Sequence, residues 1–248
     1  MTLVGVRREG AVSVLELRRA DKLNALSSVL ERDLQRELEG EAVRGSACVV
    51  LTGSGRAFSA GADITEFSER TPESIAAYYR ETGAVYEQLA ALPQPTFAAI
   101  HGYCLGGGLE LALATDFRIA DRTAVFGFPE AGLGILPSSG GTHRVARLLG
   151  AARAKELILL RERLTADEAL AAGLVTEVVA EGGALARALE HAHRLAALPP
   201  LAVSLTKQAI DAAPDSSRDA ALLIERLAYA VLAQTDAARD AAEGFGAS

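Results

Sequence analysis

One nineteen-residue segment constrains the fold more than any other part of the chain. From Phe97 to Thr115 it reads FAAIHGYCLGGGLELALAT, and its only side chains of the Asp, Glu, His, Lys and Arg types are His101 and Glu110. The apolar run Thr96–Ile100 predicts a buried strand, and GGGLELALAT predicts a helix that starts at three glycines. A carboxylate in such surroundings is paired, hydrogen-bonded or functional, because burying it alone costs several kcal/mol. The segment predicts a mixed α/β core that contains Glu110, unless Glu110 lies on a solvated stripe of its helix.

The three glycines, Gly106 to Gly108, suggest what this helix start does. Glycine allows a ligand to approach the backbone closely, and a helix N-terminus presents free N–H groups and the positive end of the helix dipole. That arrangement suits an oxyanion. The alternative is a tight strand-to-helix turn with close packing.

The rest of the chain divides into a mixed α/β part and a helical part. Alternating polarity predicts a hairpin of strands at residues 3–8 and 11–17. Helical spacing and capping residues predict a helix from Ser27 or Ser28 to Leu38 and another from Pro72 to about Leu92. A third helix is expected after Gly140-Gly141 as far as Leu149, and a fourth over Thr165–Ala172, with a Thr165/Glu168 capping box. After Pro199-Pro200 no strand pattern remains. We therefore expect a core over residues 1–198 and a helical oligomerisation segment over residues 199–248.

Two further segments carry candidate chemistry. Glu130 follows Phe128-Pro129 at the start of an apolar loop, where it is either functional or an exposed loop acid. The Gly/Ser-rich segment TGSGRAFSAGAD lacks the GK[ST] of a phosphate-binding loop, so it is either a surface loop or a place of exposed backbone N–H groups. Ser138, Ser139 and His143 suggest nucleophilic catalysis, but no GxSxG surrounds the serines and helix capping explains them better.

Composition excludes several functional classes. The net charge of −7 gives no reason to expect a nucleic-acid partner, and no apolar run reaches the length of a membrane span. The four histidines lack metal-site spacing, so no metal is expected. Cys48 and Cys104 lie apart in apolar surroundings and predict two buried free thiols, which suits a reducing compartment. No signal peptide is indicated, and we expect a cytoplasmic protein.

Five segments taken together resemble the crotonase superfamily, the enoyl-CoA hydratase/isomerase family. They are RRADKLNAL (Arg18–Leu26), LTGSGRAFSAGADI (Leu51–Ile64), HGYCLGGGLELALATDFRIA (His101–Ala120), FGFPEAGLGILPSSGGTHRVARLLG (Phe126–Gly150) and LTADEALAAGLVTEVV (Leu164–Val179). The resemblance implies an α/β spiral of ββα units with C-terminal helices that build a homotrimer or a homohexamer. It also implies an acyl-CoA thioester substrate.

The resemblance further implies roles for individual residues. Glu110 and Glu130 match the two catalytic glutamates of the hydratases, which add water to a trans-2-enoyl-CoA to give a 3-hydroxyacyl-CoA. The N–H groups of Ala62 and Gly107 match an oxyanion hole for the thioester oxygen. The positions that match the CoA-lining segments are Lys22, Leu23, Ala60, Asp63 and Ile64. No cofactor is implied, since CoA is part of the substrate.

Two alternatives stay open at this point, isomerisation or another acyl-CoA reaction of the family and a binding protein, and one departure from the family is visible. A family isomerase typically keeps only the second acid, so a glutamate at both positions favours hydration over double-bond isomerisation. A binding protein of the same fold, for acyl-CoA or RNA, is the non-enzymatic alternative, against which the intact glutamate pair argues. The chain stops at RDAAEGFGAS, where members of this family commonly continue into a basic tail that can contact CoA phosphates, so other basic groups are expected to replace that tail.

Overall fold

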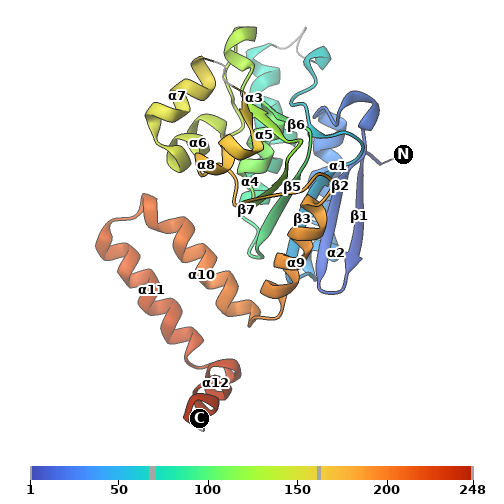
Figure 1. Ribbon diagram of the computed structural model, residues 1–248. Coiled ribbons are helices and arrows are strands. Elements are labelled where there is room, and N and C mark those ends of the chain that lie inside the picture. The colour runs from blue at the N-terminus through green and yellow to red at the C-terminus, as the bar shows by residue number, and fades with distance from the viewer. Residues whose placement is uncertain (1, 67–70, 161–162, 247–248) are drawn as a thin grey trace.

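The computed structural model describes residues 2–66, 71–160 and 163–246. It contains two sheets whose strands are supplied in turn by successive passes of the chain (Figure 1). The larger sheet has the order β1 (Val4–Glu9), β2 (Val12–Leu17), β3 (Cys48–Gly53), β5 (Thr96–Ile100), β7 (Phe117–Asp121), β10 (Glu177–Val179). The smaller sheet has the order β4 (Ala57–Ser59), β6 (Tyr103–Leu105), β8 (Val125–Gly127), β9 (Leu164–Thr165).

Each of three passes gives one strand to each sheet and then continues into a helix. The strand pairs β3/β4, β5/β6 and β7/β8 follow this pattern, and the neighbouring strands that they supply run parallel. The first two strands form the expected antiparallel hairpin, with Val4 opposite Leu17 and Glu9 opposite Val12. The expected α/β spiral of ββα units with a C-terminal helical segment is confirmed.

Helices cover both faces of the larger sheet. The helices of the core are α1 (Ser28–Leu38), α2 (Glu41–Arg44), α3 (Pro72–Arg80), α4 (Val85–Ala90), α5 (Gly107–Leu113), α6 (Gly141–Leu149), α7 (Ala151–Leu159), α8 (Ala166–Ala171) and α9 (Ala184–Ala196). The small residues Ala184, Ala188 and Ala192 allow α9 to pack closely on one face, and these alanines are buried there. The opposite face forms the larger core with α1, α4 and α5.

Local sequence signals place several helix ends as expected. The Ser27 side chain accepts a hydrogen bond from the Leu30 N–H at the start of α1, and Thr165 and Glu168 form a capping box at α8. The single helix expected from Pro72 to Leu92 is wrong. The chain leaves helical geometry at Glu81 and makes a 3-10 turn, η3 (Thr82–Ala84), so that α3 and α4 are separate helices.

The C-terminal helices extend away from the two sheets. The helices α10 (Pro200–Ala212) and α11 (Arg218–Leu232) lie side by side, and α12 (Asp236–Gly246) ends the described chain (Figure 1). Lys207 ties α10 to the core: its ammonium group lies 2.9 Å from a carboxylate oxygen of Asp116. The boundary at residue 199 stays a prediction. Within the described ranges, no helix is long and apolar enough to cross a lipid bilayer.

Candidate active site

Glu110 is a buried carboxylate held by two backbone amides. The first turn of α5 carries it into the core, where only 4% of the residue is exposed. Its Oε1 accepts hydrogen bonds from the N–H groups of Ser139 at 2.7 Å and Gly141 at 2.8 Å. The alternative of a solvated stripe is therefore wrong. The two donors come from the segment that begins α6, so α6 and α5 together fix this carboxylate.

The glycines at the start of α6 make this contact possible. A Cβ atom on Gly141 would lie 2.8 Å from Cγ and from Oε1 of Glu110, closer than side chains normally pack. Gly140 is the N-terminal cap of α6 with a φ of 95°, and no side chain caps the helix. The expected helix-capping role of Ser138 and Ser139 is therefore wrong, because Ser139 gives its backbone N–H to Glu110 instead.

Glu130 is a second buried carboxylate with a different environment. It begins the 3-10 helix η4 (Glu130–Leu133) and is 8% exposed, so the alternative of an exposed loop acid is wrong. Its Oε2 is buried and finds no hydrogen-bond partner in the described part of the chain. A Cβ atom on Gly106 would lie 2.6 Å from Oε1 of Glu130, so the absence of a side chain there makes room for this carboxylate beside the start of α5.

The two carboxyl groups influence each other but hold protons differently. Burial, with the nearby charge of Glu110, raises the pKa of Glu130 to about 7. Burial also raises the pKa of Glu110, but the amides of Gly141 and Ser139 and the charge of Arg144 oppose that rise. Amide donors stabilise the ionised form of a carboxyl group, and Glu130 has no such donor at Oε2. When the pair shares one proton, that proton belongs mainly to Glu130.

Two backbone N–H groups meet beside this pair. Leu26 donates to the Gly61 carbonyl at 2.8 Å and accepts from the Asp63 N–H at 2.9 Å, so the Ala62 N–H between them is not used in that ladder. Gly107 begins α5, where a helix has no internal acceptor for its N–H. A Cβ atom on Gly107 would lie 3.4 Å from the Ala62 nitrogen, which places the two peptide groups next to each other.

The residues expected to line CoA come together along the same edge. Ala60 donates its N–H to the Leu23 carbonyl at 2.9 Å, which joins the segment of Lys22 and Leu23 to the segment from Ala60 to Ile64. Lys22 is exposed at the end of η1 (Ala20–Lys22), and Ile64 is 63% exposed. Asp63 differs from these, because its carboxylate is engaged.

The Asp63 carboxylate is part of the support of this edge. Arg19 lies 2.6 Å from it, and the Thr65 hydroxyl donates to it at 2.7 Å. These hydrogen bonds, first that of Thr65 and then that of Arg19, lower the pKa of Asp63. Through these contacts Asp63 stabilises the loop that contains Ala62.

Sequence reasoning missed two buried polar groups near α5. Glu31 of α1 is 2% exposed and accepts hydrogen bonds from the hydroxyl groups of Tyr86 at 3.0 Å and Tyr78 at 2.7 Å. Arg118 is also buried, and its guanidinium group donates to the carbonyls of Thr115 and Leu174. Arg118 thereby holds the turn that follows α5, and a longer contact of 3.5 Å reaches the carbonyl of Ala112 in the last turn of that helix. The one available signal was the charged Arg118 between the apolar Phe117 and Ile119, whereas Glu31 is followed by two more charged residues and gave no such signal.

Comparison with known proteins identifies the family. The enoyl-CoA hydratase/isomerase family model matches residues 7–247, nearly the whole chain. The chain belongs to this family. The resemblance found in the five sequence segments is thus confirmed.

Members of the family and their solved structures match over almost the full length. A short-chain-enoyl-CoA hydratase from Clostridium acetobutylicum is 39% identical over 243 residues, covering 97% of this chain and 93% of that protein. A 2,3-dehydroadipyl-CoA hydratase from Escherichia coli is 39% identical over 244 residues, covering 98% and 93%. The crystal structure of an enoyl-CoA hydratase from Bacillus anthracis superimposes with a TM-score of 0.91 at 37% identity, covering 98% and 96%.

Proposed function

We propose that this protein is an enoyl-CoA hydratase, which adds water in the syn sense to a trans-2-enoyl-CoA and forms a 3-hydroxyacyl-CoA. The observation that carries the proposal is the pair of buried carboxyl groups, Glu110 held by two amides and Glu130 with an oxygen that has no partner in the described chain. Family relatives named as hydratases support the same reaction.

The thioester oxygen is placed between the N–H groups of Ala62 and Gly107. Addition of water to the double bond builds negative charge on that oxygen, and two preorganised donors stabilise the resulting enolate. Loss of one such donor typically costs about 2.7–4 kcal/mol of transition-state stabilisation. The adjacency of the two peptide groups supports this assignment.

Glu110 and Glu130 divide the acid–base work. Both hydrogen bonds from backbone amides to Glu110 end on Oε1, so we assign Oε2 to the attacking water, whose proton it accepts as the hydroxyl oxygen bonds to the β-carbon. Glu130, with a pKa of about 7, carries the proton that passes to the α-carbon near neutral pH. The CoA part lies along Lys22, Leu23, Ala60 and Ile64, while Asp63 supports the loop. This chemistry requires no metal or redox cofactor.

The test is hydration of crotonyl-CoA by wild type, Glu110→Gln and Glu130→Gln, followed by loss of the enoyl-thioester absorbance. Each positioned acid–base group contributes roughly 10²–10⁴ to the rate, so each variant should lose at least about that factor. The losses should not multiply in the double variant, since both groups act on one water. Full hydration by Glu110→Gln would refute the two-carboxylate mechanism.

Two other outcomes would replace the proposal. If wild type moves the double bond of a 3-enoyl-CoA but adds no water to any 2-enoyl-CoA, the protein is an isomerase of this family. If it binds acyl-CoA or RNA and converts neither kind of enoyl substrate, it is a binding protein. Isothermal titration beside the two activity assays separates these cases.

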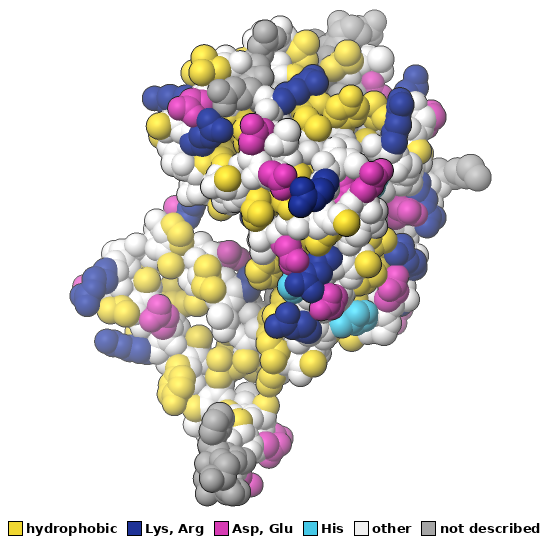
Figure 2. Space-filling model, in the orientation of Figure 1, with side chains coloured by type: hydrophobic (Ala, Val, Ile, Leu, Met, Phe, Trp, Pro, Cys, Tyr) yellow, Lys and Arg dark blue, Asp and Glu magenta, His cyan; other side chains and the backbone are white. Residues whose placement is uncertain are grey.

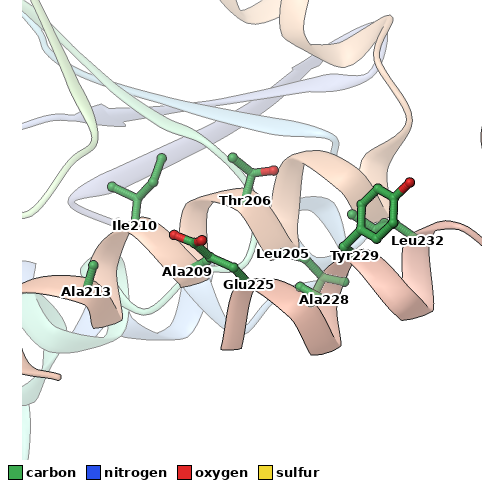
Figure 3. Close-up of a pocket in the computed structure, with 9 residues that line it drawn as sticks. All are labelled: Leu205, Thr206, Ala209, Ile210, Ala213, Glu225, Ala228, Tyr229 and Leu232. Atoms are coloured by element: carbon green, nitrogen blue, oxygen red, sulfur yellow. The ribbon is translucent and has the colours of Figure 1, made fainter. Parts of the chain in front are cut away.

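We also propose that the protein assembles as a homotrimer or a homohexamer through its C-terminal helices and works in the cytoplasm. On α11, Leu223, Leu227 and Val231 are each more than half exposed in the single chain, and Figure 2 shows hydrophobic side chains gathered over these helices. The groove between α10 and α11 is lined by apolar groups such as Leu205 and Leu232 (Figure 3). Exposed apolar surface of this kind favours a partner copy.

Light scattering tests the assembly. A mass of three or six chains is expected at micromolar concentration, and a monomer alone would contradict it. For the location, two buried free cysteines, Cys48 and Cys104, support a reducing compartment. Fractionation of cells that express the protein tests that part separately.

A further inference from the structure

Helix α3 reaches residues on two sides of the proposed site through its tyrosines but has little packing of its own. None of its residues from Pro72 to Arg80 is buried, although Thr71 caps its start and Pro72 opens it. A helix without buried apolar groups gains little stability from packing, so its position depends on a few specific contacts. Two adjacent tyrosines on α3, Tyr78 and Tyr79, supply such contacts in two different directions.

Tyr78 anchors α3 on the side of Gly107. Its hydroxyl group donates to Glu31 at 2.7 Å, and the same carboxylate oxygen accepts from Tyr86 at 3.0 Å. The Tyr86 hydroxyl oxygen lies 3.4 Å from the place that a Cβ atom on Gly107 would take. This contact therefore holds α3 near the proposed oxyanion hole.

Tyr79 anchors α3 on the side of Glu110. Its hydroxyl group donates to the hydroxyl oxygen of Ser138, and the next residue, Ser139, donates its N–H to Glu110. The Ser139 segment is itself fixed, because Arg144 donates to the Ser139 carbonyl at 2.9 Å and pairs with Glu87 at 2.6 Å. The backbone next to Ser138 is thus held by Arg144, whereas α3 has no buried residue to hold it.

The order of these groups gives the path that we expect for an acyl chain. With CoA along Leu23 and Ala60, the thioester at Gly107 and the double bond beside Glu110, the following carbons point towards Ser138. There the exposed apolar side chains are Ile75, one turn before Tyr79 on α3, and Leu133, Ile135 and Leu136 of the loop after Glu130. These groups suit an acyl chain, and the Tyr79–Ser138 hydrogen bond joins α3 to that loop.

We propose that the Tyr79–Ser138 hydrogen bond closes the acyl end of the site and makes the enzyme prefer short 2-enoyl chains. A four-carbon chain ends before this contact, whereas a ten-carbon chain requires α3 to move away from Ser138. The inference rests on the proposed hydratase function. In the closed form α3 is bonded to Ser138, and in the open form it has moved away. A hydrogen bond of this kind changes the ratio of the two forms by about two- to tenfold, and we expect an effect of that size.

The experiment compares crotonyl-CoA with trans-2-decenoyl-CoA in Tyr79→Phe, Ser138→Ala and the double variant. Each single variant should raise the ratio of kcat/KM for decenoyl-CoA over crotonyl-CoA by about two- to tenfold. The double variant should show no more than either single one, because both remove the same bond. Tyr103→Phe, which removes a hydroxyl group from a residue that is 40% exposed on β6, is the matched control.

The outcomes separate this inference from the proposed function. An unchanged chain-length ratio in both single variants, or effects that multiply in the double variant, would overturn the inference while hydration itself stands. Calorimetric titration with butyryl-CoA and decanoyl-CoA, which lack the double bond, gives the same ratio as a Kd. That measurement tests the contact even if wild type hydrates neither substrate, and an unchanged Kd ratio would equally overturn it.

Discussion

Replacement of Glu130 by glutamine should remove activity and add stability, and the added stability should depend on pH. A carboxyl group whose pKa is raised by the fold binds its proton more tightly in the folded chain than in the unfolded one. Stability then falls as pH rises from the ordinary pKa of 4.5 to the folded pKa of about 7, and the full penalty applies above that range. Glutamine cannot ionise and escapes this penalty.

The magnitude follows from the size of the shift. A difference of about 2.5 pKa units at 1.36 kcal/mol per unit corresponds to about 3 kcal/mol. The free energy of unfolding of Glu130→Gln, minus that of wild type, should therefore increase by about 3 kcal/mol between pH 4.5 and pH 8. For a chain of this size that is about 6–12 °C in Tm. The glutamine NH2 group near the unpaired oxygen adds a constant offset, so the pH dependence is the diagnostic quantity.

Urea unfolding followed by circular dichroism at pH 5, 6, 7 and 8 measures this difference, since the chain has no tryptophan for fluorescence. Protein concentration must be held fixed, because assembly contributes to stability by mass action. Glu181→Gln, at an exposed glutamate in the loop after β10, controls for the loss of one negative charge. A stability difference for Glu130→Gln that stays flat from pH 5 to 8 would refute the reasoning.

Three shorter predictions follow from the same site. Gly107→Pro removes the N–H assigned to the enolate, so turnover should be lost while the Tm, measured by calorimetry, changes far less. Gly141→Ala places a Cβ 2.8 Å from the Glu110 side chain, so kcat should fall at least about tenfold. A kcat equal to that of wild type would show that the amides of Ser139 and Gly141 do not fix Glu110 for catalysis. Hydration needs a proton on Glu130, so kcat/KM should fall above about pH 7; a rise through pH 7 to a plateau would reverse the assignment.

Local signals in the sequence were sufficient for the regular elements. The hairpin, the Ser27 cap and the Thr165/Glu168 capping box involve residues close together in the chain, so spacing reveals them. The break between α3 and α4 was missed because spacing does not reveal the close approach that accompanies it: a Cβ atom on Gly83 would lie 2.9 Å from the Tyr78 ring. The strands β4 and β6 were missed because each consists of three residues within a segment rich in glycine, which is typical of a loop.

The residues of the site also fall into those that the sequence revealed and those that it did not. Glu110 could be identified because a carboxylate in an apolar helix start must have partners, and family resemblance supplied Glu130, Ala62 and Gly107. The partners of Glu110 could not be identified, because they are backbone amides from a segment 29 and 31 residues away. Backbone donors leave no side-chain signature, and the nearby serines suggested a capping role that the structure does not bear out.

A single loop accounts for the different behaviour of the two carboxyl groups. The segment from Glu130 to Gly141 begins with one carboxyl group and ends with the two amides that hold the other. At the start of the loop Glu130 is buried without a donor at Oε2, and its pKa is raised. At the end of the loop two amides donate to Glu110 and oppose the rise in the pKa of Glu110 that burial causes. The fold therefore favours the proton of the pair on Glu130, and the proposed mechanism uses Glu110 in its ionised form to orient water. A change in the length of this loop would move both groups at once, so the separation of acid from base is a property of the loop and not of either glutamate alone.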